Sequence, residues 1–123
     1  MVWDGASNTF GTQLADSSGT SSQTNTITEE SMGIAWENSS GKALLVYGST
    51  TTTLLYRELN GTWGGENTAY TGLAGPVAWL SVSGDIQLNS DYVAVGIVTA
   101  TTIRNEFGVW NGSTWVDVYK RQM

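Results

Sequence analysis

The sequence predicts an all-β chain of short antiparallel strands, and three observations lead to this prediction. An apolar residue followed by Asp-Gly or Asn-Gly occurs three times, at residues 3–5, 59–61 and 110–112. Such pairs between apolar runs are the strongest short-range hairpin signal and favour type I′ turns. Short apolar runs alternate with clusters of Gly, Ser, Thr and Asn. No segment longer than a turn repeats its apolar residues at helical spacing.

Composition excludes several classes of protein. The chain has 123 residues, of which 40% are hydrophobic, enough apolar surface for one folded domain rather than a disordered segment. Only five Lys and Arg oppose eleven Asp and Glu, and the net charge of −6 leaves no basic surface for nucleic acid or anionic lipid. No apolar run reaches the roughly 20 residues of a spanning helix. We therefore expect neither nucleic-acid binding nor membrane insertion.

Histidine and cysteine are both absent from the sequence. The chain therefore cannot form a disulfide, and it lacks the commonest general base and the commonest metal ligand. We expect no metal site and no cofactor.

Residues 1–32 are predicted to form half of a repeat unit plus a polar loop. Residues 1–3 read as the end of a strand, 4–8 as a turn and 9–14 as its hairpin partner. Residues 15–26 are rich in Ser, Thr, Gly, Asn and Gln, which is typical of a surface loop.

Residues 33–72 are predicted to form the first full unit of four strands, at 33–37, 42–48, 54–59 and 62–70. The second of these strands is almost continuously apolar, which predicts burial on both faces.

Residues 73–119 are predicted to form a second full unit with strands at 76–80, 91–99, 103–110 and 114–119. Its first strand repeats the Ala-Trp pair of the first unit, so that Trp79 echoes Trp36. The strand at 91–99 is again apolar and is expected to be buried on both faces.

Four short strands per unit, at a spacing of roughly 43 to 52 residues, predict the blades of a β-propeller. One small sheet cannot cover both of its faces, whereas stacked sheets cover each other. We expect a partial propeller of about two and a half blades, whose end units expose Trp3, Trp110 and residues 92–98 in part and tend to associate. The alternative is that the strands close into a sandwich or small barrel.

Several phrases carry a resemblance to a known group of repeats: Trp36-Glu37, Ser40-Gly41, residues 43–48, Tyr56-Arg57, Ser90-Asp91, Val95-Gly96 and residues 109–115. They resemble propeller-like repeats of large secreted or surface-anchored bacterial proteins. This resemblance implies an extracellular or cell-surface location with the export signal outside these residues. It also implies a non-catalytic structural or recognition role, with further blades or other surface proteins as partners.

A looser resemblance, to the fucose-binding propeller lectins, implies a glycan site. Tyr56, Arg57, Glu58 and Trp63 match the wording of a lectin blade, in which an Arg, a Glu and an aromatic residue hold one sugar. The second unit departs from that wording at residues 107–110. A surface ion pair between Arg57 and Glu58, worth about 0–1 kcal/mol, is the competing interpretation.

The tryptophans present a similar choice. Exposed indoles are able to stack on sugar rings. Five of them are expected at equivalent positions of the repeat units, which favours packing between blades: Trp36, Trp63, Trp79, Trp110 and Trp115.

Catalysis is the third possibility, because the turns also resemble the Asp-box turns of sialidase-like propellers. Such enzymes hold the substrate carboxylate with three Arg, and this chain offers only Arg57, Arg104 and Arg121. A glycosidase needs two carboxylates flanking the bond. Glu29, Glu30, Glu37, Asp85, Asp91 and Glu106 show no recognisable spacing. We therefore predict that the chain is not an enzyme.

Residues 117–122 resemble the translation of a sequencing adapter, which implies an assembly scar at the end of a gene fragment. The alternative is a genuine last strand with a charged tail.

Overall fold

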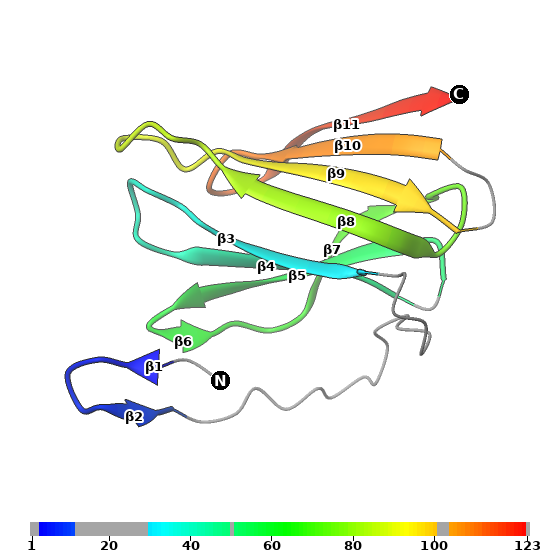
Figure 1. The fold of residues 1–123 in the computed structure, drawn as a ribbon. Helices are drawn as coiled ribbons and strands as arrows, with labels where there is room; N and C mark the ends of the chain where they lie inside the picture. Colours follow the sequence, from blue (N-terminus) through cyan, green and yellow to red (C-terminus); the bar gives the residue numbers. More distant parts are fainter. Residues whose placement is uncertain (1–2, 12–29, 50, 101–103, 123) are drawn as a thin grey trace.

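The computed structural model describes residues 3–11, 30–49, 51–100 and 104–122, and all regular structure within them is β-strand (Figure 1). The all-β prediction is therefore confirmed. The expected polar loop at 15–26 lies outside the described residues. Among the described residues no helix is long and apolar enough to cross a bilayer.

Eleven strands follow one another along these described stretches: β1 (Trp3–Asp4), β2 (Thr9–Phe10), β3 (Met32–Trp36), β4 (Ala43–Gly48), β5 (Thr53–Asn60), β6 (Thr62–Trp63), β7 (Asn67–Thr71), β8 (Val77–Gly84), β9 (Val93–Thr99), β10 (Arg104–Trp110) and β11 (Trp115–Gln122).

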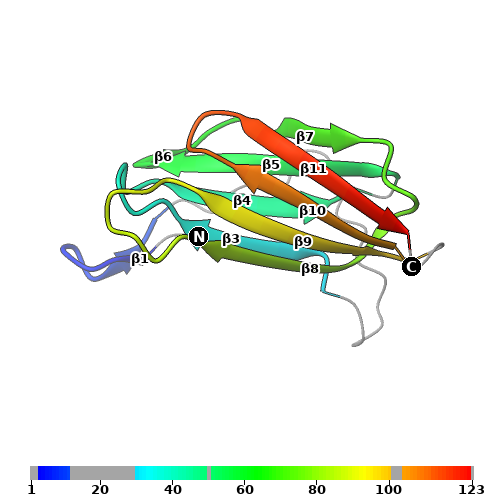
Figure 2. The ribbon, with the colours of Figure 1, turned by 90° about the horizontal axis from the view of Figure 1, so that it is seen from above.

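The strands form two larger antiparallel sheets and one small hairpin. The first sheet has the order β3-β4-β5, and β6 and β7 both pair with β5, so that they share its fourth position. The second sheet has the order β8-β9-β10-β11, and β1 pairs only with β2. Figures 1 and 2 show the two larger sheets stacked face to face, with β3 and β8 along the same edge. No closed sheet occurs in the described part of the chain.

The three Asp-Gly and Asn-Gly turns each join antiparallel strands, as predicted: β1 to β2, β5 to β6 and β10 to β11. The expected type I′ geometry is wrong, because that turn needs positive φ at both central residues. In the second and third turns only the glycine has a positive φ, 72° at Gly61 and 93° at Gly112. In the first hairpin the residue with positive φ is Asn8. The Asn111 side chain instead accepts the amides of Ser113 and Thr114, a local bond that fixes the turn without left-handed Asn.

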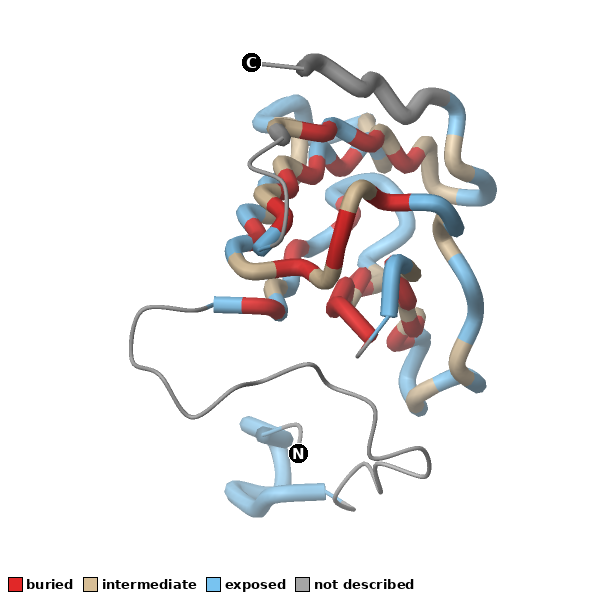
Figure 3. Tube along the Cα trace, turned by 90° about the vertical axis from the view of Figure 1, so that its right-hand side faces the viewer, coloured by how far each residue is buried: buried red, intermediate tan, exposed pale blue. Residues whose placement is uncertain are grey.

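The hydrophobic core lies between the two larger sheets (Figure 3). The first sheet contributes Leu44, Val46 and Leu54, and the second contributes Leu80, Val93, Val95, Ile97 and Trp110. Burial of these branched side chains and of one indole supplies most of the stabilisation of the fold.

The strand β4 is buried on both faces, as expected, with Ala43, Leu44 and Val46 completely covered. The same expectation for the second unit is wrong, because β9 alternates: Val93, Val95 and Ile97 are buried, whereas Ala94 is exposed. The far face of β4 differs because it lies beneath the segment between β6 and β7, where Glu66 and Gly64 bond to Tyr47 and Arg57.

The residues expected to be partly exposed at the ends of the chain are exposed in some cases and buried in one. Trp3 and Tyr92 are half exposed. The expected exposure of Trp110 is wrong, since its indole is completely buried. It points into the core rather than toward the free face of its sheet.

Two glycines allow β3 and β8 to approach closely. A Cβ built on Gly33 would lie 2.6 Å from Val82 Cγ2, and one built on Gly84 would lie 2.7 Å from the carbonyl oxygen of Trp36. Just before β3, the Glu30 amide donates to the Ala78 carbonyl at 3.0 Å, and the Leu80 amide donates to the Glu30 carbonyl at 2.7 Å. The two edge strands are thereby joined at one end and packed backbone to backbone at the other.

Candidate functional site

Strand pairing gives the two larger sheets the same register. The row of directly paired residues beside the hairpin turns is Trp36-Ala43-Leu59-Trp63 in the first sheet and Gly84-Val93-Trp110-Trp115 in the second. The next row on the same face follows the same correspondence, Ile34-Leu45-Arg57 against Val82-Val95-Gly108. The Asn-Gly turns coincide when the two sheets are aligned by this register.

Equivalent rows do not face each other across the core. The row of Trp110 points toward the first sheet, where that indole is completely buried. The row of Trp36 points away from the second sheet, and its indole is 58% exposed. A two-fold sandwich would turn equivalent rows toward one another, whereas head-to-tail stacking turns them all in one direction. The two sheets are therefore stacked head to tail.

Each sheet has an outer face turned away from the other sheet, and side-chain alternation assigns the residues to it. The outer face of the first sheet carries Met32, Ile34, Trp36, Ala43, Leu45, Tyr47, Leu55, Arg57, Leu59 and Trp63. Its exposed part is β3, because Tyr47 and Arg57 are buried and bond to the segment that links β6 to β7. On β8, β9 and β10 the outer face of the second sheet carries Trp79, Ser81, Ser83, Ala94, Gly96, Val98, Asn105, Phe107 and Val109.

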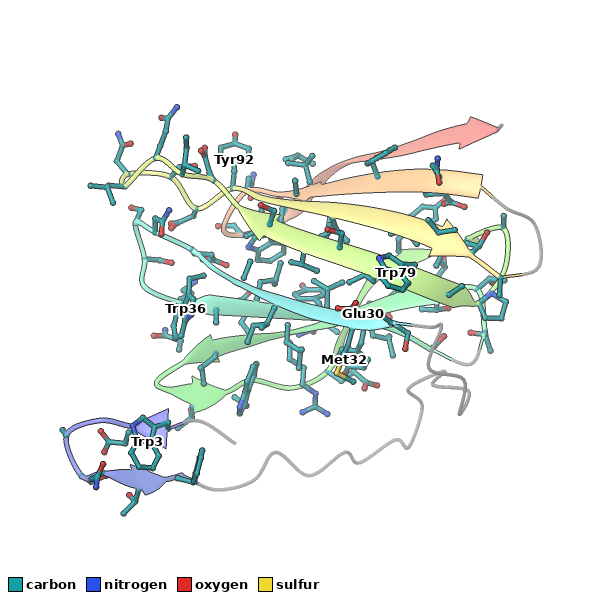
Figure 4. All side chains as sticks on the ribbon, viewed as in Figure 1. Trp3, Glu30, Met32, Trp36, Trp79 and Tyr92 are labelled. Carbon is teal, nitrogen blue, oxygen red and sulfur yellow. The ribbon has the colours of Figure 1, made fainter. Side chains whose placement is uncertain are left out.

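The expected equivalence of Trp36 and Trp79 is wrong. Trp36 pairs with Ala43 beside the β3–β4 turn, whereas Trp79 pairs with Val98 at the other end of its strand. In the superposed register Gly84 occupies the place of Trp36, and its missing side chain makes room for the Trp36 backbone. Both indoles point outward on their own sheets and are about half exposed (Figure 4).

An aromatic contact joins the two sheets close to the Asn-Gly turns. The Tyr56 ring of the first sheet lies 5.1 Å from the Trp110 ring and 5.7 Å from the Trp115 ring of the second, centroid to centroid. The two indoles are themselves 5.6 Å apart. Tilted and edge-on rings at these distances attract beyond their burial. Burial, and secondarily the charge of Glu58, raises the pKa of Tyr56.

A buried carboxylate lies beside this contact. Glu37, immediately after β3, is only 1% exposed, and its Oε1 accepts the indole N–H of Trp110 at 2.7 Å. The other oxygen accepts the Ser40 hydroxyl at 2.8 Å. Both carboxylate oxygens are thus satisfied, one of them by the opposite sheet.

Two loops are bonded together above Glu37. The amides of Ser39 and Ser40 donate to Asp91 Oδ1 at 2.9 and 2.8 Å, and the Asn38 side chain donates to the carbonyl of Asp85. The Gln87 amide, followed by the Ser90 hydroxyl, lowers the pKa of Asp85. The β3–β4 turn of the first sheet is therefore held by the longer β8–β9 loop of the second sheet.

The sequence-predicted glycan residues do not come together. Tyr56 and Glu58 lie on the core side of β5, whereas Arg57 and Trp63 belong to the outer face of the first sheet. Glu58 forms an ion pair with Lys42 at 3.6 Å rather than with Arg57. The competing interpretation, an exposed Arg57–Glu58 pair, is wrong as well, because Arg57 is only 8% exposed.

Arg57 belongs to a polar chain beneath the segment that links β6 to β7. Its Nε donates to the Tyr47 hydroxyl at 3.3 Å and its Nη1 to the Gly64 carbonyl at 3.4 Å. The Tyr47 hydroxyl donates to Glu66 Oε2 at 2.6 Å. Desolvation and the bond to Glu66 raise the pKa of Tyr47. These bonds tie Nε and Nη1 of the guanidinium to protein atoms, so this arginine supports the sheet.

Glu106 is another of the carboxylates considered from the sequence. Glu106 is completely buried, and its Oε1 accepts the Ala74 amide at 3.0 Å. No group of three Asp or Glu side chains among the described residues is placed to hold a metal ion. The side chains of Arg104 and Arg121, and residue Glu29, lie outside the described part of the chain.

A shallow groove of about 580 Å³ runs along the edge where β3 and β8 meet. Its lining includes Glu30, Met32, Ile34, Trp79 and Ser81, which come from both outer faces. The labelled side chains in Figure 4 show Glu30 and Trp79 on this edge, with Met32 below them. The groove is lined by apolar side chains together with Ser81 and the Glu30 carboxylate.

Sequence reasoning missed the burial of Glu37 and Arg57, because charged side chains are seldom buried. It also passed over Phe107, which was considered only as a departure from the lectin wording. The signal was present in the Asn-Gly repeat: Phe107 and Tyr56 each stand four residues before the Asn. No protein-family model matches the chain, and neither a curated protein nor a solved structure is significantly similar to it.

Proposed function

We propose that the chain is a non-catalytic structural repeat module, a segment of a β-propeller whose blades stack head to tail. The observation that carries this proposal is the shared register with one-way facing: the row of Trp110 faces the first sheet while the equivalent row of Trp36 faces away from it. Radially arranged blades turn every equivalent row in the same direction. The proximity of β3 and β8 along one edge fits the inner strands of neighbouring blades.

The site between the sheets is built for cohesion. Its polar groups, Glu37 and the Asp91 carboxylate, bond to the neighbouring repeat, and its aromatic rings contact each other. Membership in an exported bacterial surface protein is drawn from the resemblance of the Trp-Asn-Gly phrases, and the apolar outer faces agree with further blades of the same polypeptide as partners.

Tandem duplication of the chain tests the proposal. If the repeats stack head to tail, the second copy covers an outer face of the first, and nearest-neighbour coupling raises the stability of the duplicated chain. We expect a higher Tm and a single cooperative transition in calorimetry. A duplicated chain that melts at the same temperature as the single one would contradict the proposal.

Glycan binding is the alternative, because exposed Trp36 and Trp79 are able to stack on sugar rings. A glycan array separates the two functions. Saturable fucose binding that is lost in Arg57→Ala, with the fold intact by circular dichroism, favours the lectin. Binding lost in Trp79→Ala but retained in Arg57→Ala places a sugar at the edge groove instead.

A fragment of a sialidase-like enzyme is the third candidate. We expect no turnover of sialosides or common glycosides, because both oxygens of Glu37 are bonded to protein donors and Glu106 is completely buried. Turnover abolished in Glu37→Gln or Glu58→Gln would overturn the non-catalytic assignment.

A further inference from the structure

Each outer face corresponds in strand register to one of the two faces that already pack together inside the chain. When the second sheet is superposed on the first by this register, Ser81 takes the position of Gly33. In the same superposition Phe107 takes the position of Tyr56. On the opposite outer face, Ile34 stands where Val82 stands. Each outer face therefore carries the counterpart of one side of the internal interface.

Exposure on these faces is concentrated in large apolar side chains. On the first sheet Met32, Ile34 and Trp36 are 43%, 52% and 58% exposed, and on the second Trp79 and Phe107 are 47% and 52% exposed. Aromatic residues and Met are enriched at the centre of protein interfaces. Single exposed apolar residues are ordinary, but several on one sheet face indicate a contact surface.

Charge is sparse on the strands that carry these exposed side chains, although the chain has a net charge of −6. On β8, β9 and β10 the outer face has no Asp, Glu, Lys or Arg. On β3, β4 and β5 it has one cation, Arg57, which is buried and bonded. Depletion of charge marks the core of an interface.

We infer that a second copy of this chain docks on these faces head to tail, with the outer face of the second sheet of one copy against the outer face of the first sheet of the next. The β8 strand of one copy then lies along β3 of the other, as β3 and β8 lie together within one chain. Ser81 meets Ile34, as Gly33 meets Val82. The contact is heterologous, so copies add in one direction to a closed ring or an open chain. This inference rests on the head-to-tail stacking proposed above.

The test is light scattering on the full chain across a concentration series, with one charged substitution on each face. Ile34→Asp and Phe107→Asp should each weaken association roughly thirtyfold or more, the effect of losing an interface anchor. The matched control is Leu88→Asp, an 85% exposed apolar residue in the β8–β9 loop that belongs to neither face. It should associate as the unchanged chain does. Melting curves check the fold, and Ile34→Thr replaces Ile34→Asp if the latter is unfolded.

Mixing the two variants gives the decisive result. Each retains one intact face, so an equimolar mixture of Ile34→Asp and Phe107→Asp should form a discrete two-copy complex, while each alone stays monomeric. A strictly monomeric unchanged chain, or a mixture without the complex, overturns self-docking. If the tandem chain is nevertheless stabilised, the stacking of repeats stands and only the second copy as partner is lost.

Discussion

The indole Nε1 of Trp110 donates a 2.7 Å hydrogen bond to Oε1 of Glu37, across the interface between the two sheets. The residues are 73 positions apart, and both are almost completely buried. A buried carboxylate is costly unless it is hydrogen-bonded. This one is bonded to its own turn through Ser40 and to the opposite sheet through Trp110. The bond therefore depends on the correct stacking of the two sheets.

Replacement of Glu37 should reveal how much this bond stabilises the fold. We expect Glu37→Ala to lower the free energy of unfolding by about 2–3 kcal/mol, because it removes a charge-assisted bond and leaves the Trp110 N–H buried without an acceptor. Glu37→Gln keeps a carbonyl acceptor and should cost less. Urea titration followed by Trp fluorescence measures both.

The control is Glu58→Ala. Glu58 holds Lys42 at 3.6 Å with both side chains partly exposed, so its loss should change the stability by at most about 1 kcal/mol. Equal losses in Glu37→Ala and Glu58→Ala would contradict the structural role assigned to Glu37.

The strand pattern was predictable from sequence because hairpin turns and apolar runs are local signals. The Asn60-Gly61 and Asn111-Gly112 turns correctly place β5, β10 and β11, and the continuous apolar run of β4 predicts its burial. The single strand expected at 62–70 is wrong, because the structure divides it into β6 and β7. The direction in which each face points was not predictable. It depends on pairing register, and aligning Trp79 with Trp36 by their Ala-Trp wording reads that register wrongly.

The candidate site was less accessible to sequence reasoning, because it is formed by residues distant along the chain. Tyr56 meets Trp110 and Trp115, and Glu37 meets Trp110, only after the sheets stack. Adjacent Tyr56, Arg57 and Glu58 suggested a cluster, but alternation along β5 sends Arg57 to the opposite side from its neighbours.

Close backbone packing between β3 and β8 gives a second prediction. A Cβ on Gly84 would lie 2.7 Å from the Trp36 carbonyl oxygen, a backbone atom that cannot rotate away. We expect Gly84→Ala to lower the free energy of unfolding by about 1–3 kcal/mol through overpacking. Gly65→Ala is the matched control, since its Cβ would meet no atom within 4 Å. Thermal melts compare the two, and a Gly84→Ala chain as stable as Gly65→Ala would contradict the packing.

The dependence of stability on alkaline pH follows from Tyr47 and Tyr56. Burial raises the pKa of both in the folded chain, whereas an unfolded Tyr titrates near about 10. Their contribution is fully present below the unfolded pKa and is lost as the pH rises through the folded values, because the unfolded chain releases these protons first. We expect the free energy of unfolding to fall above about pH 10.

Substitution of each Tyr by Phe identifies which residue causes the fall in the free energy of unfolding at alkaline pH. Tyr47→Phe and Tyr56→Phe should each reduce the slope in urea titrations across this pH range, and the double variant should reduce it most. Tyr47→Phe should also lower stability at neutral pH, because it removes the bonds to Glu66 and Arg57. A slope that is unchanged in the double variant would show that other groups control alkaline unfolding.

The contact between Tyr56 and Trp115 provides the most direct measurement of the interaction energy between the two sheets. The ring centroids are 5.7 Å apart at an interplanar angle of 72°, an edge-on pair across the sheet interface. In a double-mutant cycle with Tyr56→Ala and Trp115→Ala we expect a coupling of about 0.5–1.5 kcal/mol. The control cycle pairs Phe107→Ala with Trp115→Ala. Phe107 occupies the register position of Tyr56 but points to the outer face, so its coupling to Trp115 should stay within about 0.5 kcal/mol of zero. Equal coupling in the two cycles would show that the coupling energy of Trp115 arises within its own sheet rather than across the interface between the sheets.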